Sequence, residues 1–410
     1  MKAVVFHGIG DIRMDRVSEP RIEDDNDAIV RLTASAICGT DLHMVRGTMP
    51  GMKPGTILGH EGVGVVEEIG DNVRNLRVGD RVVIPSTIAC GACSYCRSGY
   101  FAQCDHANPN GPQAGTAFFG GPLETGAFDG LQAEYARVPF ANVGLVKLPE
   151  EVSDDQAILL SDIFPTGYMA AELAEICPGN TVCIFGCGPV GQFAIASAKL
   201  MNAGRIFAVD CIESRLEMAR RQGAEVINFD EEDPVEALRE LTNGIGPDRV
   251  IDCVGVDAVA PHDGPAEKKS KAMKPRFKFE QKLVAPKTNP RRGNWEPGDA
   301  PSQVLDWMVD SVAKAGTVSI IGVYPLTLYT FPIGKAMNRN LSIEMGNCNH
   351  RAYIPKLVDM VRAGVVDPTE ILTQTGPLTG AIDAYLNFDK RQPGWVKVML
   401  EPGATATRAA

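Results

Sequence analysis

Hydrophobic positions follow two different patterns along this chain. Residues 1–165 contain short β-type runs of apolar residues separated by glycine turns, such as Ala28–Ala34, Gly62–Ile69 and Ala133–Val138. Beyond them, apolar runs alternate with helical patterns, and this alternation predicts βαβ units around a parallel sheet. The expected strands of this second region are Thr181–Phe185, Arg205–Val209, Glu225–Asn228, Arg249–Cys253, Thr317–Ile321 and Leu341–Met345.

These patterns predict an α/β fold with more than one domain. We expect a mainly-β domain over 1–165, a doubly wound parallel sheet of the Rossmann type over 166–347, and a return to the first domain over 348–410. The strand Trp395–Leu400 is expected to complete the first domain. The small, polar tail Gly403–Ala410 is expected to be disordered.

A long insertion over 256–300 interrupts the alternation. Residues 261–300 contain ten Lys/Arg and five Asp/Glu, a net charge of +5 that leaves −16 on the rest of the chain. A loop of this length in a compact domain is usually functional or disordered. Three interpretations stay open for it, namely a lid over the adenosine half of a cofactor, a subunit interface, and a solvated loop.

Bulk composition narrows the class of function. The 410 residues carry a formal net charge of −11, which argues against a general affinity for nucleic acid or anionic membranes. No apolar run approaches the roughly 18 residues that a membrane span needs, and the start of the chain does not resemble a signal peptide. Eleven cysteines then indicate metal binding more than disulfides, so the expected location is the reducing cytoplasm.

The stretch Gly186-Cys187-Gly188-Pro189-Val190-Gly191 has the spacing G-x-G-x-x-G between an expected strand and an expected helix. In that context the glycines allow a tight turn and close approach of a pyrophosphate to the helix N-terminus. Asp210 ends the next strand and is expected to bind the adenosine ribose, which favours NAD over NADP. Arg215 lies close enough in sequence to accommodate a 2′-phosphate instead. The alternative is a glycine turn without a ligand.

Four cysteines lie close together within the segment 88–106. Cys90, Cys93, Cys96 and Cys104 form C-x2-C-x2-C-x7-C, which fits a closed, tetrahedral, structural zinc site. An iron–sulfur cluster also takes four cysteines, but it is less expected beside a hydride-carrying cofactor.

A second candidate zinc site combines Cys38 in C-G-T-D-L-H with His60 in G-H-E, and Asp162 is the best candidate for a third ligand. Three protein ligands and one open position are typical of catalytic zinc. Taken singly, Cys38 is more often a buried free thiol and His60 a core histidine, and it is their occurrence beside the other motifs that favours a metal site. Candidates for the substrate pocket are Thr87, Phe119, Phe128 and Met337, although aromatic and methionine positions are more often plain core. Four histidines have no partner at metal spacing and are interpreted as structural or exposed, namely His7, His106, His262 and His350.

Together, C-G-T-D-x-H, G-H-E, the four-cysteine lobe and G-x-G-P-V-G resemble the zinc-dependent medium-chain dehydrogenase/reductase superfamily over about residues 1–402. The segment S-D-I-F-P-T-G-Y and the long insertion most resemble the glutathione-independent formaldehyde dehydrogenase branch. The resemblance implies a GroES-like catalytic domain, a Rossmann domain, and a homodimer or homotetramer.

The resemblance also implies roles for individual residues. Cys38, His60 and Asp162 match the catalytic zinc ligands, and Glu61 matches an acid that approaches the metal in relatives. Thr40 matches the hydroxyl that bonds the substrate oxygen, and His43 the outer end of a proton relay, although a solvated surface histidine is the alternative for His43. Asp41 matches an acid next to the zinc ligands.

We therefore expect a zinc-dependent oxidoreductase that transfers a hydride from a small alcohol or a hydrated aldehyde to NAD. Zinc would act as a Lewis acid on the substrate oxygen. A polyol or threonine-type secondary alcohol dehydrogenase would carry the same motifs and is the nearest alternative. A cofactor-binding protein without catalytic activity is a more distant one.

Overall fold

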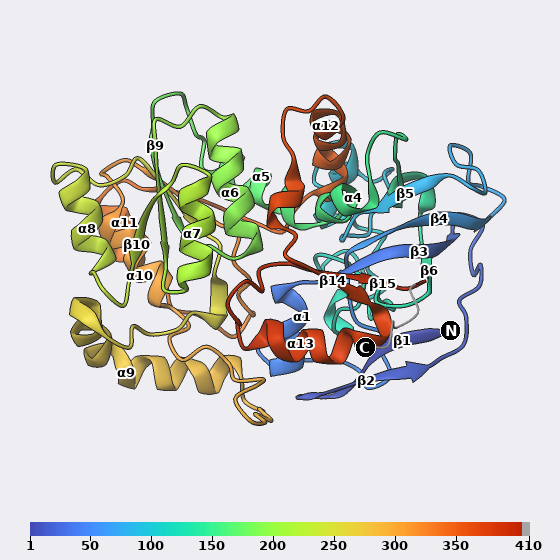
Figure 1. Ribbon diagram of the computed structural model, residues 1–410, viewed down its shortest axis with the longest axis horizontal. Helices are drawn as coiled ribbons and strands as arrows, with labels where there is room; N and C mark the ends of the chain where they lie inside the picture. Colours follow the sequence, from blue (N-terminus) through green and yellow to red (C-terminus); the bar gives the residue numbers. More distant parts are fainter. Residues whose placement is uncertain (404–410) are drawn as a thin grey trace, which may run out of the picture. The chain divides into compact units, whose positions relative to one another are not determined.

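The computed structural model describes residues 1–403 and divides into two compact units (Figure 1). One unit contains residues 1–165, 289–295 and the part of the chain from residue 347 onward, and the other contains residues 166–288 and 296–346. The expected disordered tail lies outside the described residues, apart from Gly403. No helix of the described part is long and apolar enough to cross a membrane.

The second unit is built on a six-stranded sheet in the order β10-β9-β8-β11-β12-β13, and every neighbouring pair is parallel. This order is that of a doubly wound nucleotide-binding fold, which confirms the predicted fold class. The strands are β8 (Thr181–Phe185), β9 (Arg205–Asp210), β10 (Glu225–Asn228), β11 (Arg249–Asp252), β12 (Thr317–Ile320) and β13 (Ser342–Met345).

Amphipathic helices alternate with these strands. Buried apolar residues of the sheet pack against alanine-rich helix surfaces on one side and against a cluster that includes Trp307 and Met308 on the other. The helices are α5 (Ile163–Leu173), which begins in the first unit, and α6 (Pro189–Leu200), α7 (Glu213–Arg221), α8 (Pro234–Leu241), α10 (Gln303–Ser311) and α11 (Ile333–Asn338).

The long insertion is not a continuous loop, because it contains the 21-residue helix α9 (Gly264–Val284). The side chain of Asp263 caps its N-terminus by accepting from the Gly264 N–H. Phe277, Glu280 and Val284 lie three or four residues apart and form a narrow buried stripe. Helix α9 therefore packs through a small part of its surface.

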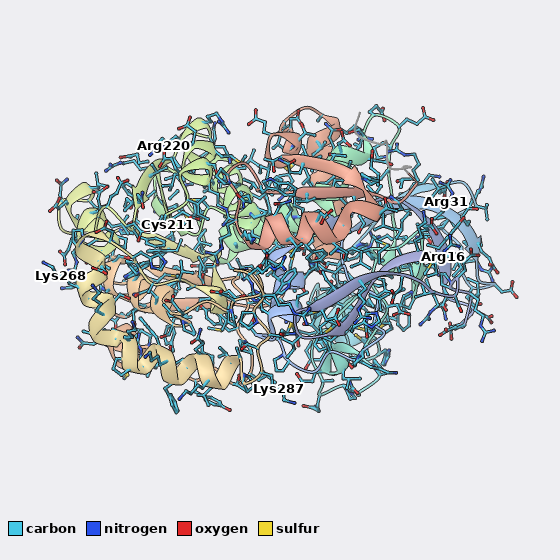
Figure 2. All side chains as sticks on the ribbon, turned by 60° about the horizontal axis from the view of Figure 1, so that its bottom comes forward. Arg16, Arg31, Cys211, Arg220, Lys268 and Lys287 are labelled. Carbon is cyan, nitrogen blue, oxygen red and sulfur yellow. The ribbon has the colours of Figure 1, made fainter. Side chains whose placement is uncertain are left out.

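Polar contacts and exposed lysines complete this helix. Arg276 forms an ion pair with Asp306 of α10, and Oε2 of the buried Glu280 accepts from the Ser302 hydroxyl over 2.7 Å. Figure 2 shows Lys268 near the start of α9 and Lys287 just beyond its end. Such a lysine-rich surface with few apolar positions explains why the hydrophobic pattern did not predict the helix.

The end of the insertion groups with the first unit, although the sequence assigned all of 256–300 to the Rossmann domain. Within the first unit, the buried carboxylate of Asp389 accepts from the Trp295 backbone N–H over 2.7 Å and from the Asn294 side chain over 3.0 Å. The same carboxylate bonds to Arg46, the last residue of α1 (Gly39–Arg46). Residues 289–295 are thus fixed to the element that carries candidate catalytic residues.

The first unit contains a seven-stranded, mainly antiparallel sheet with the path β14-β15-β3-β4-β5-β7, and β6 pairs with β3. A separate hairpin joins β1 to β2. The strands are β1 (Lys2–Gly8), β2 (Asp11–Arg16), β3 (Ala28–Ile37), β4 (Gly62–Ile69), β5 (Arg81–Ile84), β6 (Tyr135–Val138), β7 (Val146–Lys147), β14 (Gln374–Pro377) and β15 (Val398–Glu401). The helices besides α1 are α2 (Ser94–Arg97), α3 (Ala141–Gly144), α4 (Asp154–Leu160), α12 (His350–Arg362) and α13 (Ala381–Asp389).

Candidate active site

The first candidate ligand, Cys38, stands between β3 and α1 in the first unit. Its backbone is extended, with φ −114° and ψ 160°, and it is the N-cap of α1. Its backbone N–H donates to Oδ2 of Asp41 over 2.9 Å, as part of a capping box. The local turn therefore fixes the buried thiol at the start of the helix.

His60 is held by its neighbours on both sides of the ring. It follows Gly59, whose φ is +91° and whose Cβ, if present, would lie 2.4 Å from Cγ of Gln132, so only glycine fits there. Nδ1 of His60 lies 3.1 Å from Oδ1 of Asp41, while Nε2 lies 3.5 Å from Oδ2 of Asp162. A carboxylate behind a metal-binding histidine sets the tautomer and the ring orientation, and Asp41 has that geometry.

Asp162 supplies a third donor between α4 and α5. Its Oδ2 lies 3.6 Å from Sγ of Cys38. The ligand atoms of Cys38, His60 and Asp162 all lie within 4.8 Å of one another, and all three residues are buried. One sulfur, one nitrogen and one carboxylate oxygen at this spacing fit a zinc ion that keeps an open position. These residues would hold the catalytic zinc.

The charges around these donors favour a cation. Burial, together with Glu61 and Asp162, raises the pKa of the Cys38 thiol. Burial disfavours a charged imidazole, but Asp41, Cys38 and Asp162 outweigh it and raise the pKa of His60 well above its ordinary value. A divalent cation would stabilise the thiolate and the neutral imidazole together, because both are the metal-binding forms.

His350 also reaches this site, so the interpretation that it has no partner there is wrong. It is buried, and its Nε2 lies 2.7 Å from Oδ1 of Asp162. Its Nδ1 lies 3.2 Å from Oγ1 of Thr87. Burial lowers the pKa of His350, but Cys348 and Asp162 outweigh it and raise that pKa to about 10. Because 188 residues separate His350 from Asp162, local sequence carries no signal of the contact.

Glu61 is paired with a lysine that sequence reasoning missed. Both Glu61 and Lys397 have 0% of their surface exposed. Nζ of Lys397 donates to Oε2 of Glu61 and, over 3.1 Å, to the Ile37 carbonyl. Within the described residues, Oε1 of Glu61 has no hydrogen-bond partner. A single lysine in the apolar run W-V-K-V-M-L was an available signal, because a fully buried lysine is almost always paired.

Thr40 and His43 lie on α1, three residues apart and therefore on neighbouring positions of one helix face. Thr40 is half-buried in the first turn. His43 is buried, with Nδ1 3.0 Å from Oγ1 of Thr48. His43 is therefore not the solvated surface histidine of the alternative interpretation, and its part in proton transfer stays a prediction.

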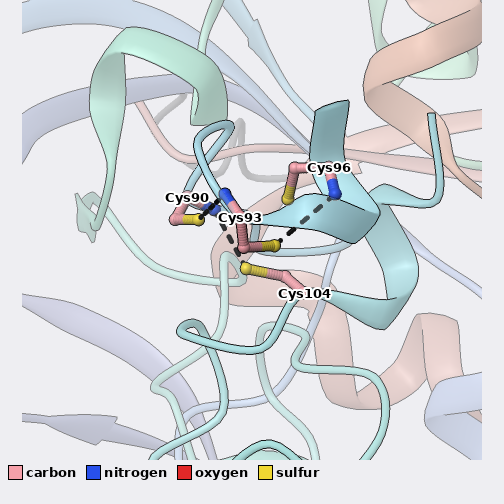
Figure 3. Close-up of side chains that lie close together, drawn as sticks. All are labelled: Cys90, Cys93, Cys96 and Cys104. Carbon is pink, nitrogen blue, oxygen red and sulfur yellow. Dashed lines mark hydrogen bonds between the residues drawn. The ribbon is translucent and has the colours of Figure 1, made fainter. Parts of the chain in front are cut away.

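The four cysteines of the second candidate metal site also come together (Figure 3). Their sulfurs accept backbone N–H groups, with Cys90 N to Cys104 Sγ at 3.2 Å and Cys96 N to Cys93 Sγ at 3.5 Å. Burial raises the pKa of Cys93, but backbone N–H groups of Cys96 and Asp105 lower it to about 6. Four converging sulfurs leave no position for a substrate, which is typical of structural zinc.

In the second unit, the glycine-rich turn has the geometry of a phosphate-binding loop. Gly186 has φ +91°, and a Cβ on Gly191 would lie 1.8 Å from the Gly186 carbonyl oxygen. A Cβ on Gly188 would meet only Arg215 Nη1 at 3.7 Å, so the backbone is open there to a ligand. Helix α6 begins at Pro189, with Gly188 as its N-cap, and directs its first N–H groups to this turn.

Asp210 ends β9 and holds the same turn in place. Its Oδ2 accepts from the Cys187 N–H over 2.7 Å, and its Oδ1 accepts from the N–H groups of Cys211 and Ile212 over 2.8 and 3.0 Å. A carboxylate has about four acceptor sites, so the ribose contact expected from the sequence is still compatible with these bonds. Arg215 lies near Gly188, where the sequence left a 2′-phosphate contact open.

Comparison with known proteins defines the class. Residues 24–150 match the family model "Alcohol dehydrogenase GroES-like domain", and residues 189–262 match "Zinc-binding dehydrogenase". The chain belongs to the zinc-type alcohol dehydrogenase family, and it is therefore an oxidoreductase of a zinc-binding class.

Individual relatives are similar over most of the chain. An uncharacterised zinc-type alcohol dehydrogenase-like protein, AdhB from Bacillus subtilis, is 37% identical over 98% of this chain and 100% of its own length. The glutathione-independent formaldehyde dehydrogenase of Pseudomonas aeruginosa is 37% identical over 63% of this chain and 66% of its own. The alcohol dehydrogenase TADH from Thermus sp. ATN1 superposes with a TM-score of 0.79, at 33% identity, over 98% of this chain and 99% of that one.

Proposed function

We propose that this enzyme oxidises a small alcohol, or the hydrated form of a small aldehyde, with NAD. In the balanced reaction the substrate loses a hydride from carbon to NAD and a proton from its hydroxyl, which gives a carbonyl compound or an acid, NADH and a proton. The observation that carries this proposal is the convergence of donor atoms from Cys38, His60 and Asp162 within 4.8 Å in the catalytic unit.

Zinc, when bound, supplies Lewis acidity that makes the substrate hydroxyl easier to deprotonate. The protein residues then have separate tasks. Cys38, His60 and Asp162 hold the metal, while Thr40 binds the substrate hydroxyl and accepts its proton. His43, one helical turn away, delivers that proton towards solvent, because an imidazole ring can accept a proton at one nitrogen and donate one from the other.

The choice of NAD rests on the end of β9. Asp210 places a negative charge beside the glycine turn, where it would accept a hydrogen bond from a ribose hydroxyl and repel a 2′-phosphate. Arg215 is the competing feature, since a guanidinium beside the same turn could pair with that phosphate. We propose that the Asp210 charge dominates, because it is fixed by three backbone N–H groups.

For the substrate, the partial match to a formaldehyde dehydrogenase supports a hydrated aldehyde, because a gem-diol presents the same hydroxyl as an alcohol. A polyol or a secondary alcohol such as threonine is the alternative. Both substrate classes can be tested in one screen of primary alcohols, hydrated aldehydes, diols and hydroxy amino acids. NADH formation is measured by absorbance at fixed zinc loading. Formaldehyde or short primary alcohols are expected to give the highest kcat/KM, and a preference for diols or threonine would replace the proposal with the alternative.

The same screen also tests the role of the zinc site in catalysis, with one variant of the ligand Asp162. Asp162→Asn keeps the shape of the side chain and removes its charge. Lewis-acid catalysis is worth several kcal/mol, so at least about a hundredfold loss of kcat/KM is expected. Wild-type protein that binds zinc and NAD but oxidises none of these compounds would exclude the proposed function.

We further propose a homodimer formed at the edge of the Rossmann sheet, in a reducing cytoplasm. Strand β13 ends the sheet, and no other described strand pairs with its outer edge. Apolar side chains of the segment that precedes β13 in the sequence are largely exposed, with Leu326 at 86%, Tyr329 at 82% and Met337 at 80%. Edge strands and large apolar surfaces of this kind are usually covered. Analytical ultracentrifugation should show a dimer that Tyr329→Glu with Met337→Glu converts to monomer, and a monomeric wild type would contradict this interface.

A further inference from the structure

A buried line of three side chains ends at the candidate zinc site. The Thr87 hydroxyl lies 3.2 Å from Nδ1 of His350, and Nε2 of His350 lies 2.7 Å from Oδ1 of Asp162. Thr87 is 7% exposed, His350 3% and Asp162 8%. The three residues come from the segment after β5, the first residue of α12 and the junction of α4 with α5. Such a buried chain is maintained by folding of the whole unit.

The two oxygens of the Asp162 carboxylate have different neighbours. Oδ1 faces His350, whereas Oδ2 lies 3.6 Å from Sγ of Cys38 and 3.5 Å from Nε2 of His60. An ionised carboxylate only accepts hydrogen bonds, so Nε2 of His350 carries the proton that they share. Oδ2 is then the oxygen presented to the metal.

We propose that His350 is a positioning residue that holds Asp162 as a ligand through one oxygen, and that Thr87 orients His350 for this task. This inference deepens the proposed function and rests on it, because it concerns the same zinc. A carboxylate can bind metal through one or two oxygens. Occupying Oδ1 prevents the second mode and so keeps the open coordination position for substrate.

The arrangement mirrors the other side of the site. There, the carboxylate of Asp41 orients the ligand histidine His60 over 3.1 Å. Here, a histidine orients the ligand carboxylate. Partners of metal ligands commonly change metal affinity or activity by about 10–100-fold when they are removed, and we assign an effect of that size to His350.

The test measures zinc affinity directly. Variants His350→Leu, His350→Gln and Thr87→Val are compared with the wild type by competition for zinc with a chelator, with the four-cysteine zinc as an internal standard. The amide of glutamine can donate to Oδ1 as Nε2 does, so His350→Gln should retain most of the affinity, and His350→Leu should lose about 10–100-fold. Thr87→Val should show a smaller loss.

Cobalt substitution gives a second measurement, the visible absorption of the metal site. This absorption would not change if His350 only stabilised the fold. Cobalt bound at Cys38, His60 and Asp162 absorbs in the visible range, and the bands should shift in His350→Leu and return towards the wild type in His350→Gln. The matched control is His7→Leu, which removes a histidine that bonds a carboxylate, Asp15, over 2.6 Å elsewhere in the same unit. It should alter neither affinity nor bands.

The outcomes separate this inference from the proposed function. A wild type that binds only one zinc would remove the proposed function. A wild type with two zinc ions, together with a His350→Leu variant of unchanged affinity and cobalt bands, would overturn the role of His350 alone. If His350→Leu does not fold, the other two variants decide. An unchanged zinc affinity in Thr87→Val, together with a full loss of zinc affinity in His350→Gln, would also overturn the role of His350.

Discussion

Removal of Lys397 should destabilise the catalytic unit far more than removal of an ordinary surface lysine. The Lys397→Met substitution keeps a side chain of similar volume, but the buried carboxylate of Glu61 loses its ion pair with Lys397. Both side chains are 0% exposed. Breaking a buried pair by removing one partner costs about 3–5 kcal/mol of unfolding free energy, because the remaining charge stays buried and uncompensated. For a unit of this size that corresponds to a fall in Tm of roughly 6–20 °C.

Two further variants isolate the cause. Lys397→Met combined with Glu61→Gln removes both charges and should recover most of the lost stability, because a neutral pair leaves no buried charge. The matched control is Lys147→Met, which breaks the surface pair with Asp80, where the lysine is 59% exposed. A surface pair of this kind contributes about 0.2–1 kcal/mol.

The assay is urea unfolding followed by circular dichroism, with calorimetry for Tm. The pKa of Lys397 is raised because Glu61 and Cys38 outweigh the opposing effect of burial. The contribution of Lys397 to the free energy of unfolding is therefore fully present below the ordinary lysine pKa of 10.5. It is lost as pH rises through the higher pKa that Lys397 has in the folded protein. A loss of less than about 1 kcal/mol in Lys397→Met near neutral pH would show that the pair contributes no more than a surface ion pair. A double variant no more stable than the single one would show that the uncompensated Glu61 charge is not the cause of the loss.

Other predictions concern the remaining sites. Cys96→Ser should reduce bound zinc from two ions to one per chain and lower Tm, as measured by metal analysis and calorimetry, because closed zinc sites contribute directly to folding. Asp210→Asn should lower kcat/KM for NAD relative to NADP by about tenfold or more, as steady-state kinetics with both cofactors would show, because the charge that repels the 2′-phosphate is gone; an unchanged ratio would assign the preference elsewhere. His43→Ala should slow alcohol oxidation by about 10²-fold near neutral pH with partial rescue by added imidazole, and an unchanged pH–rate profile would remove His43 from proton transfer.

The Rossmann elements were predictable because each strand and helix has its own hydrophobic period. The expected strands Thr181–Phe185 and Glu225–Asn228 agree with β8 and β10, and the other four expected strands of that unit differ by one residue at one end. Helix α9 was not predictable in this way. Its buried positions Phe277, Glu280 and Val284 include a carboxylate and are surrounded by lysines, and Pro275 lies inside the helix. Packing against the unit, rather than an apolar pattern, defines this helix.

In the candidate site, too, residues in short sequence motifs were predictable, whereas partners from distant parts of the chain were not. Cys38 and His60 stand in short motifs whose chemistry is apparent from the sequence, and the four cysteines lie within 15 residues of one another. The partners that complete the site come from far along the chain. Lys397 is 336 residues from Glu61, and His350 is 188 residues from Asp162. Such contacts depend on how α12 and β15 pack in the first unit, which hydrophobic periodicity does not specify.

The most direct test of the catalytic assignment is a crystal structure of the purified enzyme with anomalous difference maps recorded on both sides of the zinc absorption edge. Two zinc peaks are expected per chain. One should lie among the four cysteine sulfurs, and the other at about 2.0–2.3 Å from Cys38 Sγ, a His60 ring nitrogen and one Asp162 oxygen. A fully loaded enzyme with a zinc peak only at the four cysteines, and none between Cys38, His60 and Asp162, would contradict the account.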